Sequence, residues 1–137
     1  MDLQRAKAML QEKQLTCVLC KGEAVYESTR RGVAPLMGFW QQRINLKGFS
    51  AADKVVGKAT ALLYCLLEVK AVYANVISSP ALDLLLTHGI LVQYDRLVDA
   101  IKNRAGDGFC PMETATLAID DPALAPAAIQ KALDNLK

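Results

Sequence analysis

The chain begins with apolar residues at helical spacing, which predicts an amphipathic helix over residues 2–14 with Asp2 as its cap. Two short apolar runs follow, over residues 15–20 and 24–28, and a loop that contains Gly22 separates them. Because glycine suits a tight reversal of the chain, these runs predict a β-hairpin. We expect the first helix to cover one face of the sheet to which the hairpin belongs.

The middle of the chain predicts a short helix, a long helix and a buried strand. Apolar residues over 36–40 predict the short helix. Ser50 follows a turn and is a suitable cap for the long helix, which we predict to begin at Asp53 and to run to about Leu67. Residues 71–77 are almost uniformly apolar, which is typical of a central strand buried on both faces.

The second half of the chain continues this alternation. Ser78, Ser79 and Pro80 predict the start of another helix, because serine caps helices and proline suits their first turn, and Gly89 predicts its end. Beyond Gly89 the pattern predicts a strand, a short helix, a polar loop and two further helices, over residues 90–94, 97–102, 103–108, 111–119 and 125–136.

Alternating helices and strands after a hairpin predict an α/β fold, a three-layer α/β/α sandwich with a mixed sheet. A chain of 137 residues that is 53% hydrophobic fits one domain, residues 1–137, in which 120–137 form a C-terminal helical extension. The longest apolar run, residues 61–67, is far shorter than the roughly 20 residues of a membrane-spanning helix. We therefore expect no membrane partner.

Charge and cysteine content narrow the class of protein further. A net charge of +2 with scattered basic residues gives no strong field for nucleic acid, so we expect no nucleic-acid partner. Four cysteines are too few for a small disulfide scaffold and fit a reducing, cytoplasmic location. Cys17 and Cys20 form a C-x-x-C, but on a strand they point to opposite faces and cannot share a metal ion. We interpret them as buried small side chains.

Three charged residues, Asp53, Lys54 and Lys58, fall in the first two turns of the predicted long helix. Lys54 and Lys58 are four residues apart and would share one helical face, where like charges repel unless an anion lies between them. Helix N-termini also favour anions. These residues are therefore candidates for binding or polarising an anionic ligand. The alternative is a solvated helix start in which Asp53 complements the helix dipole.

Cys110 precedes Pro111, which makes it the predicted cap of the next helix. Unpaired backbone amides there favour a reactive thiolate, so Cys110 is a candidate nucleophile. Glu113 stands at the third helical position, where its carboxylate could reach back to the Cys110 amide in a capping box or act as an acid or base. For both residues a capping role and a functional role stay open.

Further candidates lie at a strand end and in loops. Ser78 and Ser79 follow the predicted central strand, so their hydroxyls could join the same cleft or only cap the next helix. Arg31 and the pair Asn103 and Arg104 lie in loops, where they could bind an anion or hold the loops in place.

Three stretches of sequence resemble a small, uncharacterised bacterial family placed in the cytidine deaminase-like superfamily. They are ADKVVGKA at residues 52–59, VYANVISSPAL at 72–82, and NR at 103–104 followed by CPME at 110–113. The resemblance covers about residues 2–117. It implies a deaminase-like fold with a cleft at the amino ends of two central helices, and assembly as a homodimer.

The resemblance does not extend to the zinc ligands of the deaminases. In those enzymes one central helix begins with a His or Cys ligand followed two residues later by a catalytic Glu, and the next begins Pro-Cys-x-x-Cys. The matching positions here look like Ala51 and Asp53 in the first helix, and Ala81 and Leu84 in the second. Alanine and leucine cannot ligate a metal, so we expect neither a metal site nor a cofactor.

Two hypotheses for function follow. The first is a binding protein for a small anionic or nucleobase-like metabolite, including nucleotides. The second is a metal-independent enzyme acting on a small carbonyl or amidine substrate, with Cys110 as nucleophile assisted by Asp53, Lys54 or Lys58. A role as a subunit is also open, because the helix over 53–67 is apolar on nearly every side and the tail over 122–137 is amphipathic.

Overall fold

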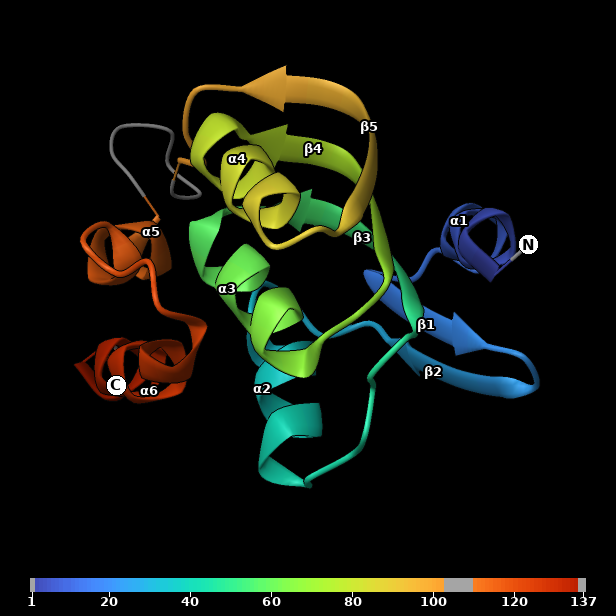
Figure 1. Cartoon of the computed structure of the whole chain (residues 1–137), viewed down its shortest axis with the longest axis horizontal. Helices are drawn as coiled ribbons and strands as arrows, with labels where there is room; N and C mark the ends of the chain where they lie inside the picture. The colour runs from blue at the N-terminus through green and yellow to red at the C-terminus, as the bar shows by residue number, and fades with distance from the viewer. Residues whose placement is uncertain (1, 103–109, 136–137) are drawn as a thin grey trace.

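The computed structural model describes residues 2–102 and 110–135 of the chain. Within them it shows an α/β fold, a five-stranded mixed sheet flanked by helices (Figure 1). The elements in chain order are α1 (Asp2–Glu12), β1 (Cys17–Lys21), β2 (Ala24–Ser28), α2 (Ala34–Gln41), β3 (Ser50–Val56), α3 (Lys58–Leu67), β4 (Ala71–Ser78), α4 (Ser79–Thr87), β5 (Leu91–Val98), α5 (Pro111–Thr116), the 3-10 helix η1 (Pro122–Leu124) and α6 (Ala125–Asn135).

The strands lie in the order β2, β1, β3, β4 and β5. Strand β1 is antiparallel to both β2 and β3, whereas β3, β4 and β5 are parallel. In this register Asp53 on β3 lies between Cys17 on β1 and Ala74 on β4. The carboxyl ends of three parallel strands therefore meet at one edge of the sheet, which is where α/β proteins place ligands.

Helices lie on both faces of the sheet (Figure 1). On one face α1 packs Leu3, Ala6 and Leu10 against the sheet. On the other face lies the larger core, centred on α3, and α4, α2, α5 and α6 all contact α3. Among the described residues, no helix has the length and apolar character that crossing a membrane requires.

Contacts within the chain account for the apolar character of α3. Nine of its residues are buried, against the sheet and the helices that surround it. The helix α6 of the C-terminal segment joins the same core through Ala125 and Ile129. A second copy of the chain is not needed to cover either element.

The boundary between β3 and α3 differs from the prediction of a helix that begins at Asp53. Ser50 is the first residue of β3 rather than a helix cap, and α3 begins only at Lys58. The β-branched pair Val55 and Val56 favours the strand, and Gly57, with an extended backbone, precedes the first helical residue. Pairing of β3 with β1 and β4 outweighs the helical spacing of the charges.

The segment after α4 also differs from the prediction. The short helix predicted over 97–102 is wrong, because β5 continues to Val98 and pairs there with Ser78. The hairpin, the central strand and the helix that begins at Ser79 are confirmed. The predicted polar loop over 103–108, with the candidates Asn103 and Arg104, lies outside the described residues.

Candidate functional site

A pocket of about 470 Å³ lies at the carboxyl end of β3, between the start of α3, the loop before α2 and the segment that leads into α5. This volume lies in the range of sites for small molecules. Three threonines and several apolar side chains contribute to its wall. Five of the residues singled out from the sequence line it together: Arg31, Asp53, Lys54, Cys110 and Glu113.

Asp53 is the most perturbed group of this pocket. Its side chain is buried, and the Tyr64 hydroxyl donates a hydrogen bond of 2.7 Å to its Oδ2. Burial raises the pKa of Asp53 from 3.8 to about 7, although hydrogen bonds from Tyr64 and from the amides of Val55 and Lys54 oppose the rise. At neutral pH the carboxyl therefore exists in both forms and can donate or accept a proton.

Tyr64 and Cys17 are buried neighbours of Asp53. Cys17 Sγ lies 3.5 Å from the Tyr64 hydroxyl oxygen, and both side chains are buried. Burial raises the pKa of Cys17 and of Tyr64 well above their ordinary values, so both stay neutral. Sequence reasoning missed Tyr64. The available signal was a hydroxyl within an apolar helix, because a buried polar group needs a partner.

Glu113 caps α3 rather than its own helix. Its Oε1 accepts a hydrogen bond of 2.6 Å from the backbone amide of Lys58, which is among the free amides at the start of α3. The predicted capping box with Cys110 is wrong, because the Cys110 amide donates to the Ile101 carbonyl instead. Burial raises the pKa of Glu113, and the Lys58 amide and charge oppose that rise.

Gly57 makes room for the Glu113 carboxylate. A Cβ on Gly57 would lie 1.6 Å from Glu113 Oε1 and 3.1 Å from Ile101 Cγ1. The backbone of Gly57 is extended and open to any residue, so it is the close approach of the carboxylate that requires glycine here.

Lys58 points away from the pocket and bonds α3 to the segment that follows α5. Its Nζ donates a hydrogen bond of 2.9 Å to the Leu117 carbonyl and lies 3.0 Å from Asp120 Oδ1. Lys54 stands on β3 and does line the pocket. The expectation that Lys54 and Lys58 share one helical face around an anion is therefore wrong.

The two candidate serines form hydrogen bonds at the start of α4. Ser78 Oγ accepts a hydrogen bond of 3.3 Å from the Ala81 amide, which confirms it as the cap of α4, and Ser79 Oγ donates to the Val98 carbonyl at 3.3 Å. Neither serine lines the pocket. Cys110 stands at the cap position of α5, but its side chain makes no capping hydrogen bond.

Fold and site define an α/β protein with a pocket of small-molecule size where a parallel strand passes into a helix. Among residues 2–102 and 110–135, no three His, Cys, Asp or Glu side chains are grouped to hold a metal ion. Residues 5–133 match the family described as TM1506, domain of unknown function (DUF1893), and the chain belongs to this family.

A solved structure supports this assignment. The chain is similar to the crystal structure of a DUF1893 family protein (TM1506) from Thermotoga maritima, with 30% sequence identity and a TM-score of 0.85. The alignment covers 98% of this chain and 89% of the other. No curated protein matches the chain.

Proposed function

We propose that the pocket beside Asp53 binds a small anionic or nucleobase-like metabolite. The observation that carries this proposal is the placing of a buried carboxyl, Asp53, beside Lys54 and Arg31 in one pocket of about 470 Å³. A carboxyl whose pKa is raised to about 7 can serve as a donor or an acceptor for the ring nitrogens of a heterocycle. Lys54 and Arg31 supply positive charge and donors for an anionic group.

The proposal includes a deaminase-like fold without zinc. A zinc deaminase places a metal ligand and, two residues later, a glutamate at the start of this helix. Because α3 begins at Lys58, the corresponding positions are Gly57 and Ala59, not Ala51 and Asp53. Neither residue can ligate a metal, and a side chain on Gly57 would collide with the Glu113 carboxylate. The corresponding residues of α4, Ala81 and Leu84, are apolar and buried. The residues present do not fit the deaminase zinc, and the proposed function contains no step at a metal.

A thermal-shift screen of nucleobases, nucleosides, nucleotides and small carboxylates tests the proposal. At least one class is expected to raise the melting temperature, since a ligand at 100 times its Kd adds about 2.7 kcal/mol to the free energy of unfolding. In Lys54→Gln the Kd of that ligand should rise about tenfold, by the loss of one charge-assisted hydrogen bond.

Lys70→Gln is the matched control, because Lys70 is also exposed but lies at the opposite end of the parallel strands and does not line the pocket. Its Kd should equal that of the unchanged protein. A screen without any stabilising compound, or an equal loss of affinity in both variants, would contradict binding at this pocket.

The second candidate function is metal-independent catalysis with Cys110 as nucleophile. Cys110 is the one cysteine of the four that is not buried, and it shares the pocket with Asp53 and Glu113. If it is activated, iodoacetamide should alkylate the native protein near neutral pH faster than a free thiol, and Cys110→Ser should abolish the reaction. A rate no higher than that of a free thiol removes the enzyme hypothesis and leaves the binding hypothesis unaffected.

A further inference from the structure

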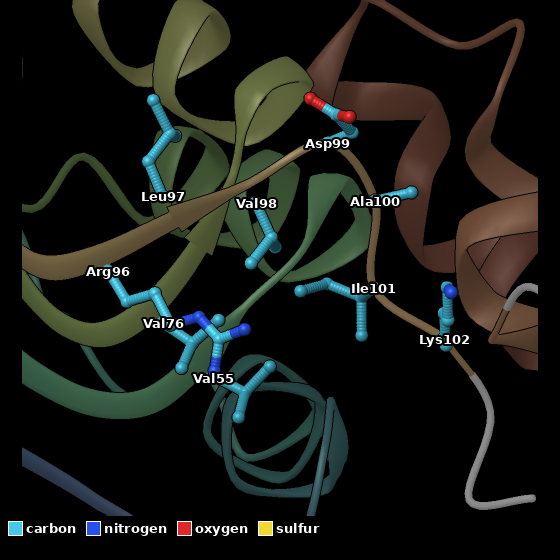
Figure 2. Close-up of a pocket in the computed structure, with 9 residues that line it drawn as sticks. All are labelled: Val55, Val76, Arg96, Leu97, Val98, Asp99, Ala100, Ile101 and Lys102. Atoms are coloured by element: carbon cyan, nitrogen blue, oxygen red, sulfur yellow. The ribbon is translucent and has the colours of Figure 1, made fainter. Parts of the chain in front are cut away.

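A second hollow, of about 780 Å³, opens on the sheet beside the pocket (Figure 2). We call it the Arg96 hollow, after the guanidinium group at one side of it. Its apolar floor and wall consist of Val55, Val76, Val98 and Ile101. Figure 2 shows Val98 and Ile101 pointing into the hollow, whereas Leu97 points away from it.

The strand register explains why these side chains meet. Val55 on β3 pairs with Val76 on β4, and Val76 pairs with Arg96 on β5, so the three form one row across the sheet. Their neighbours Val56 and Ile77 instead belong to the core around α3. Val55 itself is left 43% exposed.

The hollow and the pocket adjoin each other. Val55 and Ile101 line both of them. A ligand that contacts Asp53 in the pocket can therefore extend over these two apolar side chains to reach Arg96 without leaving the protein surface. Flat or aliphatic groups suit such a crossing, because they bury apolar area against valine and isoleucine.

Positively charged side chains on the wall of the hollow favour an anion. Arg96 and Lys102 are exposed, and among the described residues neither side chain forms a hydrogen bond or an ion pair. Asp99 also lines the hollow, but Figure 2 shows its carboxylate turned away from the Arg96 guanidinium. A free guanidinium beside an apolar floor is suited to bidentate contact with a phosphate or carboxylate group.

We infer that the metabolite bound beside Asp53 is elongated, and that it crosses Val55 and Ile101 to place a phosphate or carboxylate group on Arg96. The inference rests on the proposed function and narrows its ligand class to heterocycles that carry an anionic group at a distance, as nucleoside monophosphates do. Lys54 contacts the part of the ligand inside the pocket, whereas Arg96 contacts only the anionic end.

Paired probes test this division of roles. The Kd values of adenosine, guanosine, cytidine and uridine are measured by calorimetry beside those of their 5′-monophosphates, for the unchanged protein and for Arg96→Gln. At least one monophosphate is expected to bind about tenfold more tightly than its nucleoside, and Arg96→Gln should reduce this ratio to about two while leaving nucleoside affinity unchanged.

Arg43→Gln, in an exposed turn after α2, is the control and should keep the full ratio. A monophosphate that binds no more tightly than its nucleoside, or a ratio that Arg96→Gln leaves intact, would overturn the inference while nucleoside binding still supports the pocket. If no probe binds, the proposed function fails for this ligand class and the inference fails with it.

Inorganic phosphate gives a second readout that does not depend on the pocket. In a titration followed by amide chemical shifts, phosphate should move the signals of Val76 and Arg96, and Arg96→Gln should abolish these changes. Small changes spread evenly over the exposed lysines and arginines would show nonspecific binding and would overturn the anion contact at Arg96.

Discussion

Between about pH 4.5 and about pH 7.5 the free energy of unfolding of the unchanged protein is expected to fall by about 3 kcal/mol because of Asp53, and Asp53→Asn is expected to remove this fall. Burial raises the pKa of Asp53 to about 7 in the folded chain, whereas the unfolded chain keeps a value near 3.8. Between these values the folded chain holds the proton and the unfolded chain releases it. The free energy of unfolding therefore falls as pH rises, until both states are ionised above about pH 7.

Urea unfolding at a series of pH values measures this effect. The difference in unfolding free energy between Asp53→Asn and the unchanged protein should grow in favour of the variant across the window. Asp95→Asn is the control, because hydrogen bonds from Tyr73 and Asn75 lower the pKa of the exposed Asp95 and move its titration below the window. Parallel curves for Asp53→Asn and the unchanged protein would show that Asp53 does not titrate near neutrality.

Gly57→Ala is expected to reduce the free energy of unfolding by about 2 kcal/mol, which is large for the addition of one methyl group. The new Cβ would lie 1.6 Å from Glu113 Oε1, so the carboxylate must leave the Lys58 amide. The loss is that of a charged cap on α3, together with crowding against Ile101.

A double-mutant cycle separates the lost cap from a simple backbone effect. In the Glu113→Ala background, where no carboxylate is present to be displaced, Gly57→Ala should cost less than about 1 kcal/mol, a coupling of more than about 1 kcal/mol. Gly38→Ala in α2 is the matched control, since its Cβ meets only Arg30 at an ordinary 3.6 Å. Additive costs at Gly57 and Glu113 would contradict the account of the cap.

Periodicity and capping residues predicted most of the fold. Helix α1, the hairpin, β4 and the start of α4 follow from local patterns that the tertiary structure reinforces. The β3 to α3 boundary was missed because Asp53, Lys54 and Lys58 also fit a helical period. What makes Asp53 part of a strand is pairing with β1 and β4, which local sequence does not report.

The candidate site was predictable as a set of residues but not as a set of contacts. Sequence reasoning singled out Asp53, Lys54 and Cys110, which the fold brings to one pocket, and their roles stay predictions. It missed the partners Tyr64 and Gly57, because the Tyr64 bond to Asp53 and the space that Gly57 leaves for Glu113 depend on packing between separate elements. The homodimer also stays a prediction, without the earlier support from an apolar α3.

Amide chemical-shift mapping during titration with nucleosides and nucleotides tests the central claim most directly, because it locates a binding site as well as detecting binding. Saturable changes are expected to concentrate on amides around the pocket, at Lys54, Gly57 and Thr60. In Lys54→Gln, at an equal low concentration of the probe, the signals of Gly57 and Thr60 should move much less, because this variant binds more weakly. No saturable change, or changes centred away from the carboxyl end of β3, would contradict the claim.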